Sequence, residues 1–264
     1  MSRLRVGLPH GLAALLLAFL FLAPLPASHA RTLSEIQARG AISMCANPDA
    51  LPYASQKADP PGFQIELGRA IAVGLGVRLE TLWILPRYRA SLVNCDILLD
   101  SINDPKIYEG RLLLSRPYQR TGVALGVVGK ADGISTFTDL SKDQKVGVMI
   151  NSLASVVLGK AGVRVSPYAF EQDMIEDLVK GELYGAAASP ASLAYYARQH
   201  PEANLGLVNA YDKEPQLAWD VSIGMRKSDR ALVDAINVIL DRMLADGSLT
   251  AIYARYGVDH RKPQ

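Results

Sequence analysis

The chain has 264 residues, with 28 basic and 26 acidic side chains and a formal net charge of +2 at neutral pH. This near balance, without a run of basic residues, excludes the electrostatic signature of a nucleic-acid-binding protein. Hydrophobic residues make up 49% and charged residues 20% of the chain, a composition typical of a globular fold. The length is sufficient for one two-lobed unit or for two small domains, each with a buried core.

The first 30 residues have the pattern of a secretory signal peptide. Arg3 and Arg5 precede the apolar segment Leu12–Leu22, and small residues occupy the positions before a cleavage point after Ala30. A membrane anchor is the alternative, but the apolar run is too short to cross a bilayer and two prolines follow it. We therefore expect cleavage after Ala30 and a mature protein in the periplasm.

The first half of the mature chain alternates between strand and helix patterns. Leu67, Ile71 and Leu75 recur at helical spacing after Gly62, and Gly76 ends this helix. Strands are expected at Ala41–Ala46, Val77–Leu82 and Ile97–Leu99. Short connections between strand, helix and strand imply a parallel sheet with right-handed crossovers.

The alternation restarts after Lys130. Around the strand Val123–Val128, further strands are expected at Lys145–Ile150, Val163–Val165, Tyr184–Ala188, Leu205–Val208 and Trp219–Met225. Helices are expected at Leu153–Leu158, Ile175–Lys180, Ala191–Gln199, Ala231–Ala245 and Leu249–Tyr256. The chain crosses between the two units near residues 119–128 and 217–225. These patterns predict an α/β, two-lobed clamshell with two hinge strands. Lobe one would comprise residues 31–122 and 220–264, lobe two residues 123–219, with a ligand cleft between them.

Several short motifs occur in the order found in a known family. They are Gly62-Phe63 with Glu66-Leu67, the segment Leu140–Val148, Lys180-Gly181-Glu182-Leu183, and Leu244–Leu249 with Tyr256-Gly257. In this order they resemble the bacterial family 3 solute-binding proteins, the amino-acid-type periplasmic receptors of ABC importers. The resemblance covers nearly the whole mature chain. It implies the type II periplasmic-binding-protein fold, a small-molecule ligand, an ABC permease as partner and a monomeric protein.

Two further features resemble a narrower group. Cys45-Ala46-Asn47-Pro48 with Leu51-Pro52-Tyr53, and the pair Cys95-Asp96, are similar to segments of the J accessory proteins of PQQ-dependent methanol dehydrogenases. Trp83–Arg89 loosely resembles their Trp-x-x-Pro-x-Arg segment, although the stretch from Pro86 to Cys95 is shorter than in that group. This resemblance implies a quinoprotein dehydrogenase as partner instead of an ABC permease.

Cys45 and Cys95 are the two cysteines of the chain. Both stand at ends of strands that are expected to lie side by side, and an oxidising compartment permits a bond between them. We predict a disulfide, which would close a loop of about 50 residues and contribute roughly 4 kcal/mol by the chain-entropy estimate. Two free buried thiols are the alternative.

The resemblance also locates the usual charged ligand anchors of amino-acid receptors. By counting from the motifs, the carboxylate-binding arginine falls at Tyr108 and the ammonium-binding acid falls at Ser189, so neither charge is present. Arg111 lies nearby, but an arginine before a strand is more often solvated. Because hydroxyl groups cannot neutralise a zwitterion, we expect free standard amino acids not to be ligands.

The predicted cleft is instead lined by polar and aromatic side chains. They are Asn47, Tyr53, Asp100, Ser101, Asn103, Tyr108 and Tyr118 from lobe one, and Asn151, Ser152 and Ser189 from lobe two. Tyr53 and Tyr118 are candidates for stacking on a ring. Asn151 and Ser152 precede a helix whose first amide groups are able to hold an anion or carboxylate, or they merely cap that helix.

Catalytic and cofactor motifs are weak in this sequence. His10 and His29 lie in the leader, His260 lies in the tail, and His200-Pro201 has the pattern of a helix end. We find no metal-ligand spacing, Gly-rich phosphate loop or nucleophile elbow. We therefore expect a non-catalytic protein without cofactor or metal.

Three functions follow from this sequence. The leading interpretation is an accessory protein of a quinoprotein alcohol dehydrogenase system, and the second is an ABC-importer receptor for a small solute. The third is a cyclohexadienyl-dehydratase-like enzyme, which would use Glu171, Asp173 or Asp100 as its general acid.

Overall fold

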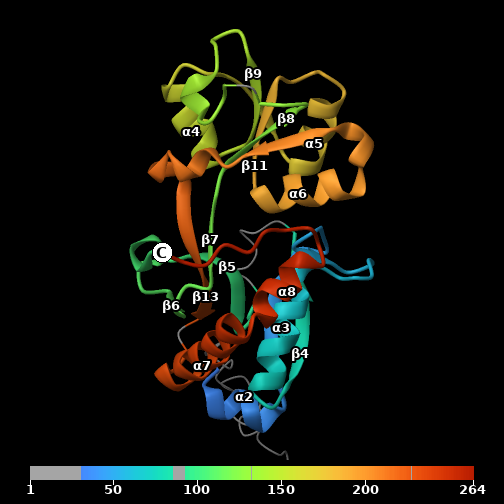
Figure 1. Ribbon diagram of the computed structural model, residues 1–264. Helices are drawn as coiled ribbons and strands as arrows, with labels where there is room; N and C mark the ends of the chain where they lie inside the picture. Colours follow the sequence, from blue (N-terminus) through green and yellow to red (C-terminus); the bar gives the residue numbers. More distant parts are fainter. Residues whose placement is uncertain (1–30, 86–92, 132, 227) are drawn as a thin grey trace, which may run out of the picture.

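The computed structural model describes residues 31–85, 93–131, 133–226 and 228–264. The predicted leader lies outside the described residues, as does the end of the Trp83–Arg89 segment. Two α/β lobes are stacked one above the other and are joined by the strands β7 and β13 (Figure 1). The narrow region between the lobes, where β7 and β13 pair, is called the waist below. The two-lobed α/β fold predicted from the sequence is confirmed.

Lobe one is built on a six-stranded sheet. Five of its strands follow the order β4-β1-β5-β13-β6, and β7 pairs with β13. β1 runs parallel to β4 and β5, as the strand–helix–strand pattern predicts. The strands are β1 (Ala41–Ala46), β4 (Arg78–Trp83), β5 (Ile97–Ile102), β6 (Leu112–Leu114), β7 (Gln119–Gly122) and β13 (Ala218–Arg226). The helices are α2 (Leu33–Arg39), α3 (Phe63–Gly74), α7 (Arg230–Asp246) and α8 (Ser248–Ala254).

Apolar side chains at helical spacing fix the helices of lobe one against this sheet. α7 buries the predicted stripe Leu232, Ile236, Ile239, Leu240 and Met243, and α3 buries Leu67 and Ile71. Gly62 precedes α3 with φ +106°, and a Cβ atom there would come within 2.4 Å of the Tyr53 carbonyl oxygen. Glycine is therefore required for the loop before α3 to pack as closely as it does.

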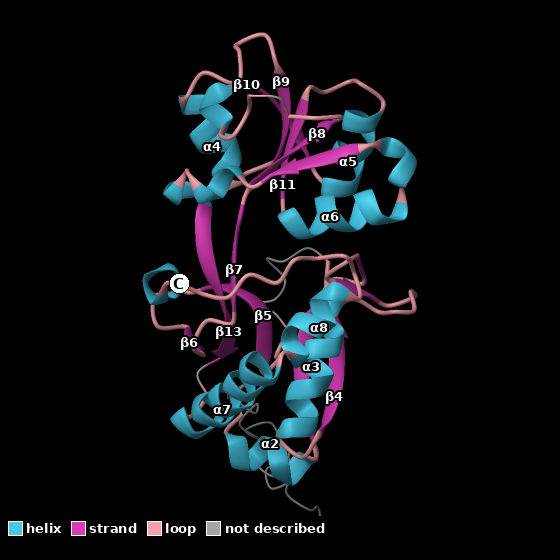
Figure 2. Cartoon of the chain, in the orientation of Figure 1, coloured by secondary structure: helices cyan, strands magenta, loops and turns pink. Residues whose placement is uncertain are grey.

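Lobe two is built on a five-stranded sheet with the order β10-β9-β11-β8-β12. β9 runs parallel to β10 and β11, whereas β8 runs antiparallel to β11 and β12. The strands are β8 (Ala124–Val128), β9 (Lys145–Met149), β10 (Arg164–Tyr168), β11 (Gly185–Ala188) and β12 (Leu205–Val208). The helices are α4 (Leu153–Lys160), α5 (Glu171–Val179) and α6 (Pro190–Gln199), and they cover the sheet in Figure 2.

The two lobes have separate hydrophobic cores. One core cluster includes Tyr118 and Val221, and the other begins at Val123 and includes Leu217. The chain therefore passes from one core to the other within the antiparallel strands β7 and β13, where Gln119 is opposite Val221. Short, paired strands between two independent cores form a hinge.

Short elements are the ones that the sequence analysis missed. α2 begins with a capping box in which Thr32 and Glu35 bond each other's backbone amides. This signal is visible in the sequence, but the helix is too short for an apolar pattern to repeat after it. β5 extends three residues beyond the predicted Leu99. The two-residue strands β2 (Asp49–Ala50) and β3 (Ala54–Ser55) and the 3-10 turns η3 (Pro105–Tyr108), η5 (Pro201–Ala203), η6 (Ala210–Asp212) and η7 (Pro215–Leu217) are too short for periodicity to register. The turn η4 (Phe137–Asp139) precedes β9.

The predicted disulfide is confirmed. The sulfur atoms of Cys45 and Cys95 are 2.07 Å apart, and their Cα atoms are 5.6 Å apart. The bond ties the end of β1 to the residues just before β5. Among the described residues, no helix is both long and apolar enough to cross a membrane.

Candidate functional site

Strand register places the predicted site residues of both lobes at the waist. In lobe one, the end of β5 pairs with β13 beside the hinge, because Ile102 is opposite Val221. In lobe two, the end of β11 lies beside the start of β8, because Ala188 is opposite Ala124. β1 and β4 run parallel to β5, and β9 and β10 run parallel to β11 through the sheet. The carboxyl ends of these strands, where α/β folds place ligands, therefore face the other lobe.

Helix α6 of lobe two is in direct contact with lobe one. Ala191 is 2% exposed and belongs to the lobe-one core cluster. The Tyr195 ring lies 6.5 Å from that of Tyr256, and Arg198 Nη1 donates to the Ala254 carbonyl at 3.2 Å. The cap residue Ser189, two residues before Ala191, therefore lies at the boundary between the lobes, as Figure 1 shows for the helix as a whole.

A carboxylate stands at the predicted lobe-two anchor position. Ser189 caps α6, with its Oγ accepting from the Ser192 amide at 3.1 Å. The Ser189 amide donates to Glu171 Oε1 at 2.9 Å, and Ser189 Oγ donates to Glu171 Oε2 at 3.0 Å. Glu171 is the first residue of α5 and half-buried. The negative charge that Ser189 lacks is thus supplied from the neighbouring helix, which the sequence analysis missed because it counted along β11 alone.

Asn151 and Ser152 follow β9 at the same edge of lobe two. Ser152 caps α4, with its Oγ accepting from the Ser155 amide at 3.1 Å. Asn151 is exposed and has φ +57°, which an asparagine tolerates better than most residues. Ser152 thus caps the helix, while an anion-holding role of the same residues stays a prediction. Because α4 follows the carboxyl end of β9, its positive end faces the edge that carries Glu171 and Ser189.

The lobe-one residues of the predicted site have different degrees of exposure. Asn103 is exposed, and Asn47, Tyr53, Asp100 and Tyr108 are half-buried. Asn47 Oδ1 accepts from the Asp49 amide at 3.0 Å, and the Tyr53 ring packs 4.9 Å from that of Phe63. The Arg111 side chain is 68% exposed, and its Nε donates to the Tyr108 carbonyl at 3.1 Å. Arg111 is therefore held against its own turn and is solvated.

Two predicted cleft residues belong to the core instead. Tyr118 is 1% exposed, and its hydroxyl donates to the Leu99 carbonyl. Burial, followed by the nearby charge of Asp100, raises the pKa of Tyr118. Ser101 is 4% exposed on β5. The prediction that both line the cleft is wrong, because alternation along β5 turns Ser101 into lobe one, and Tyr118, which precedes β7, packs into the lobe-one core.

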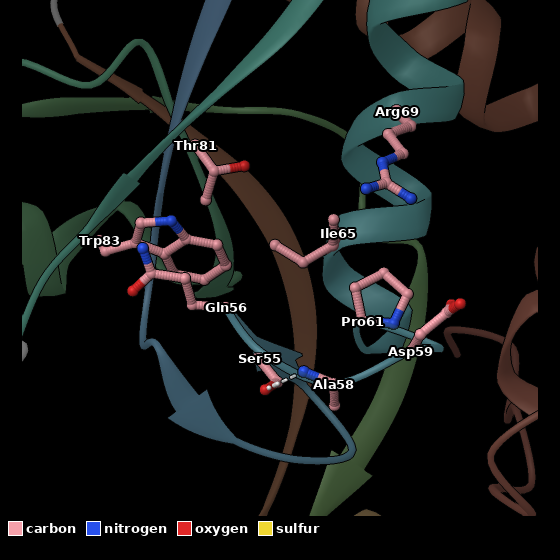
Figure 3. A pocket seen from close by; sticks show the side chains of 9 residues that line it. All are labelled: Ser55, Gln56, Ala58, Asp59, Pro61, Ile65, Arg69, Thr81 and Trp83. Atoms are coloured by element: carbon pink, nitrogen blue, oxygen red, sulfur yellow. Dashed lines mark hydrogen bonds between the residues drawn. The ribbon is translucent and has the colours of Figure 1, made fainter.

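One hollow on lobe one is lined by none of the predicted residues. It has a volume of about 260 Å³ and lies between α3, β4 and the loop Ser55–Pro61. Figure 3 shows Ile65 of α3 and Trp83 of β4 on opposite sides of it. Within the described part of the chain, no group of His, Cys, Asp and Glu side chains is arranged to hold a metal ion.

Comparison with known proteins identifies the family. The model of the bacterial extracellular solute-binding proteins, family 3, matches residues 42–259. The chain belongs to this family. The family-level resemblance drawn from the motifs is therefore confirmed, whereas the narrower resemblance to J accessory proteins stays a prediction.

Curated relatives of this solute-binding protein include a binding protein of similar length and longer proteins that it covers in part. It is 25% identical to a probable histidine-binding protein of Neisseria gonorrhoeae over 225 residues, which cover 81% of each chain. It is also 25% identical to the membrane-bound lytic murein transglycosylase F of Yersinia pestis over 93% of this chain, which spans about half (52%) of that relative. Among solved structures, an ancestral cationic amino acid solute-binding protein matches with a TM-score of 0.72 and 23% identity. That match covers 85% of this chain and 99% of the other.

Proposed function

We propose that this family 3 protein is the periplasmic solute-binding subunit of an ABC importer, and that its solute carries an ammonium or guanidinium group. The observation that carries the proposal is the Glu171 carboxylate at the Ser189 amide and hydroxyl, at the lobe boundary. Family membership and the relative named as a probable histidine-binding protein support it. In this proposal the protein binds and releases its solute unchanged.

The lobe-two edge offers complementary partners for such a solute. A carboxylate has about four acceptor sites, and two of those on Glu171 are used by Ser189. The remaining sites are able to accept charge-assisted hydrogen bonds from a cationic group. The amino end of α4, capped by Ser152, favours an anionic group such as a ligand carboxylate. The expectation that free amino acids are not ligands assumed that lobe two lacks a negative charge, and Glu171 removes that assumption.

Binding would act on the hinge. A solute held by Glu171 above and by side chains of lobe one below would favour the arrangement in which both lobes contact it. Only such differential binding shifts the equilibrium between lobe arrangements. An importer would then recognise the closed form.

The test is a thermal-shift panel in which amino acids are paired with their decarboxylated counterparts. Arginine, lysine and histidine are compared with agmatine, cadaverine and histamine. A ligand at 100 times its dissociation constant stabilises by about 2.7 kcal/mol, or roughly 5–10 °C for a protein of this size. We expect at least one cationic compound to give such a shift. Arginine failing where agmatine succeeds would uphold the prediction that free amino acids are not ligands.

Glu171→Gln is the decisive variant, and Asp173→Asn, an exposed acid on the same helix, is its matched control. Each variant is compared with its own ligand-free melting temperature, because Glu171 also holds the start of α6. We expect the ligand-induced shift to fall below about 1 °C in Glu171→Gln, a value judged on the same scale, and to persist in Asp173→Asn. A full shift in Glu171→Gln, or shifts with neutral or anionic solutes only, would refute the proposal.

An accessory role in a quinoprotein alcohol dehydrogenase system is the second candidate. It is favoured by the Cys45–Cys95 bond, because these two cysteines carry the resemblance to the J accessory proteins. Surface-immobilised protein would be titrated with the PQQ-dependent methanol dehydrogenase of the same organism. Saturable binding of the dehydrogenase by both the parent protein and Glu171→Gln would support this role. Absence of binding by the parent protein and by the variant would exclude it.

A further inference from the structure

The residues after α8 run across the waist between the two lobes. Figure 1 shows this red C-terminal segment crossing beside the hinge strands, away from α8. We call residues 254–261, from the last residue of α8 onward, the waist segment. The sequence analysis placed His260 in a tail, and the structure adds that Tyr256, Val258 and His260 are all buried.

His260 anchors the waist segment in lobe one. The side chain is 7% exposed, and its Nε2 lies 2.8 Å from the Tyr118 carbonyl oxygen. Because a carbonyl only accepts, Nε2 carries the proton, and Nδ1 is left to accept from the Thr250 hydroxyl at 3.1 Å. The ring also packs 4.9 Å from that of Tyr253.

The next residue pairs with the hinge itself. The Arg120 amide, in the middle of β7, donates to the Arg261 carbonyl at 2.8 Å and forms an antiparallel bridge. β7 pairs with β13 along its other edge, where Arg120 is opposite Asp220. The waist segment thus lies against one of the two strands that must bend or twist when the lobes move.

The side chain of Arg261 continues into lobe two. Its Nη1 lies 2.6 and 2.8 Å from the two carboxylate oxygens of Asp212, and the guanidinium lies 5.3 Å from the centre of the Tyr211 ring. Tyr211 belongs to the lobe-two core. Two consecutive residues, His260 and Arg261, therefore connect the core of lobe one, the hinge and lobe two.

The other end of the waist segment also contacts lobe two. Arg198 of α6 donates to the Ala254 carbonyl, and its aliphatic stem packs over Gly257. A Cβ atom at Gly257 would lie 2.7 Å from Arg198 Cδ, and the glycine has φ +73°. Lobe two is thus held at both ends of a segment that is fixed in lobe one.

We propose that the waist segment is a third connection between the lobes and sets their resting angle. Two hinge strands alone leave rotation of the lobes largely free, whereas contacts at two separated points define one arrangement. The Arg261 and Asp212 side chains are 31% and 50% exposed, and ion pairs at this exposure are weak enough to break and re-form as the lobes move. The proposal does not depend on which solute binds.

Distance measurement between spin labels tests this without any ligand. The labels are attached at Val73→Cys on α3 and Lys160→Cys on α4, both exposed, while the native cysteines are protected by their disulfide. We expect one narrow distance distribution for the parent protein. Arg261→Ala and Asp212→Ala should each broaden it or add a second, shifted distance.

A mutant cycle separates this role from simple loss of stability. If the two side chains act through their mutual contact, the double variant Arg261→Ala/Asp212→Ala changes the distribution no more than either single variant. Lys262→Ala, an exposed neighbour, should leave it unchanged. The proposal is overturned if both single variants keep the parent distribution, or if Lys262→Ala broadens it equally. Both outcomes are readable in any variant whose melting curve remains cooperative.

Discussion

The two lobes present different surfaces to the waist although both end their parallel strands there. Lobe one turns Ser101 and Tyr118 into its core and ties β1 to the residues before β5 by a disulfide. Lobe two leaves Glu171 and Ser189 half-buried at its edge. The same strand-end geometry therefore supports two tasks. Lobe one is cross-linked internally and turns only part of its predicted site outward, whereas in the proposed function lobe two supplies the charged ligand contact.

The largest expected effect comes from the buried ion pair of lobe one. Asp96 is 6% exposed and accepts from Arg31 Nε at 2.7 Å and from the Ser43 amide and hydroxyl at 2.7 and 2.8 Å. Asp96→Ala removes the charged partner of Arg31 and the side-chain acceptor of the Ser43 amide, which costs about 3–5 kcal/mol. Urea unfolding should show this loss, whereas Asp143→Asn on the lobe-two surface should change stability by less than about 0.5 kcal/mol. If the two variants lose equal stability, the internal contacts of Asp96 do not fix lobe one.

The disulfide should have the next largest effect. It joins residues 50 apart in sequence, and loss of such a bond typically costs about 2–4 kcal/mol. The double variant Cys45→Ala/Cys95→Ala should therefore unfold at lower urea concentration, while ligand-induced stabilisation through Glu171 is retained. If the double variant binds no ligand although it is folded, the disulfide shapes the site, and the division of tasks between the lobes is wrong.

Two glycines of lobe two give a matched pair of smaller effects. At Gly147 of β9, a Cβ atom would lie 2.6 Å from Met174 Cγ and 2.7 Å from Leu183 Cδ1, whereas at Gly159 of α4 nothing lies within 4 Å. Gly147→Ala should cost about 1–3 kcal/mol through overpacking. Gly159→Ala should be neutral or stabilise by up to about 1 kcal/mol, because alanine favours a helix. Thermal unfolding of both variants measures how tightly the core of lobe two is packed. If Gly147→Ala leaves the stability unchanged, the side chains of Met174 and Leu183 move to admit the methyl group.

Sequence reasoning was accurate where the signal is local and periodic. The stripe of α7 matches the structure because burial of one face dictates its spacing. The strand Ala41–Ala46 matches because it is a short apolar run that is buried at every position. The site was harder to predict. Glu171 and Ser189 are 18 residues apart and meet only because β10 and β11 both flank β9, a juxtaposition that no single motif contains. The prediction for Tyr118 failed because this residue lies between β6 and β7, outside any strand whose alternation would indicate the direction of its side chain.

The smallest expected effect is a pH dependence that differs between the lobes. Burial lowers the pKa of His260 in lobe one, so the unfolded chain binds a proton more readily than the folded protein below the ordinary value of 6.5. Stability contributed by His260 is therefore present above about pH 6.5 and is lost as the pH falls toward the lowered pKa. Burial raises the pKa of Glu214 in lobe two, and its contribution has the opposite sign. It grows as the pH falls through the raised pKa toward 4.5.

His260→Gln separates the two contributions, because it removes the titrating group of the waist segment. At pH 5.5, one unit below the ordinary histidine pKa of 6.5, the loss caused by His260 is at most about 1.4 kcal/mol. Unfolding at pH 7.5 and pH 5.5 should show a larger decrease in stability for the parent protein than for His260→Gln. His200→Gln, at an exposed histidine, should behave like the parent. If His260→Gln loses as much stability on acidification as the parent, the histidine of the waist segment titrates in water, and the segment is not anchored in lobe one.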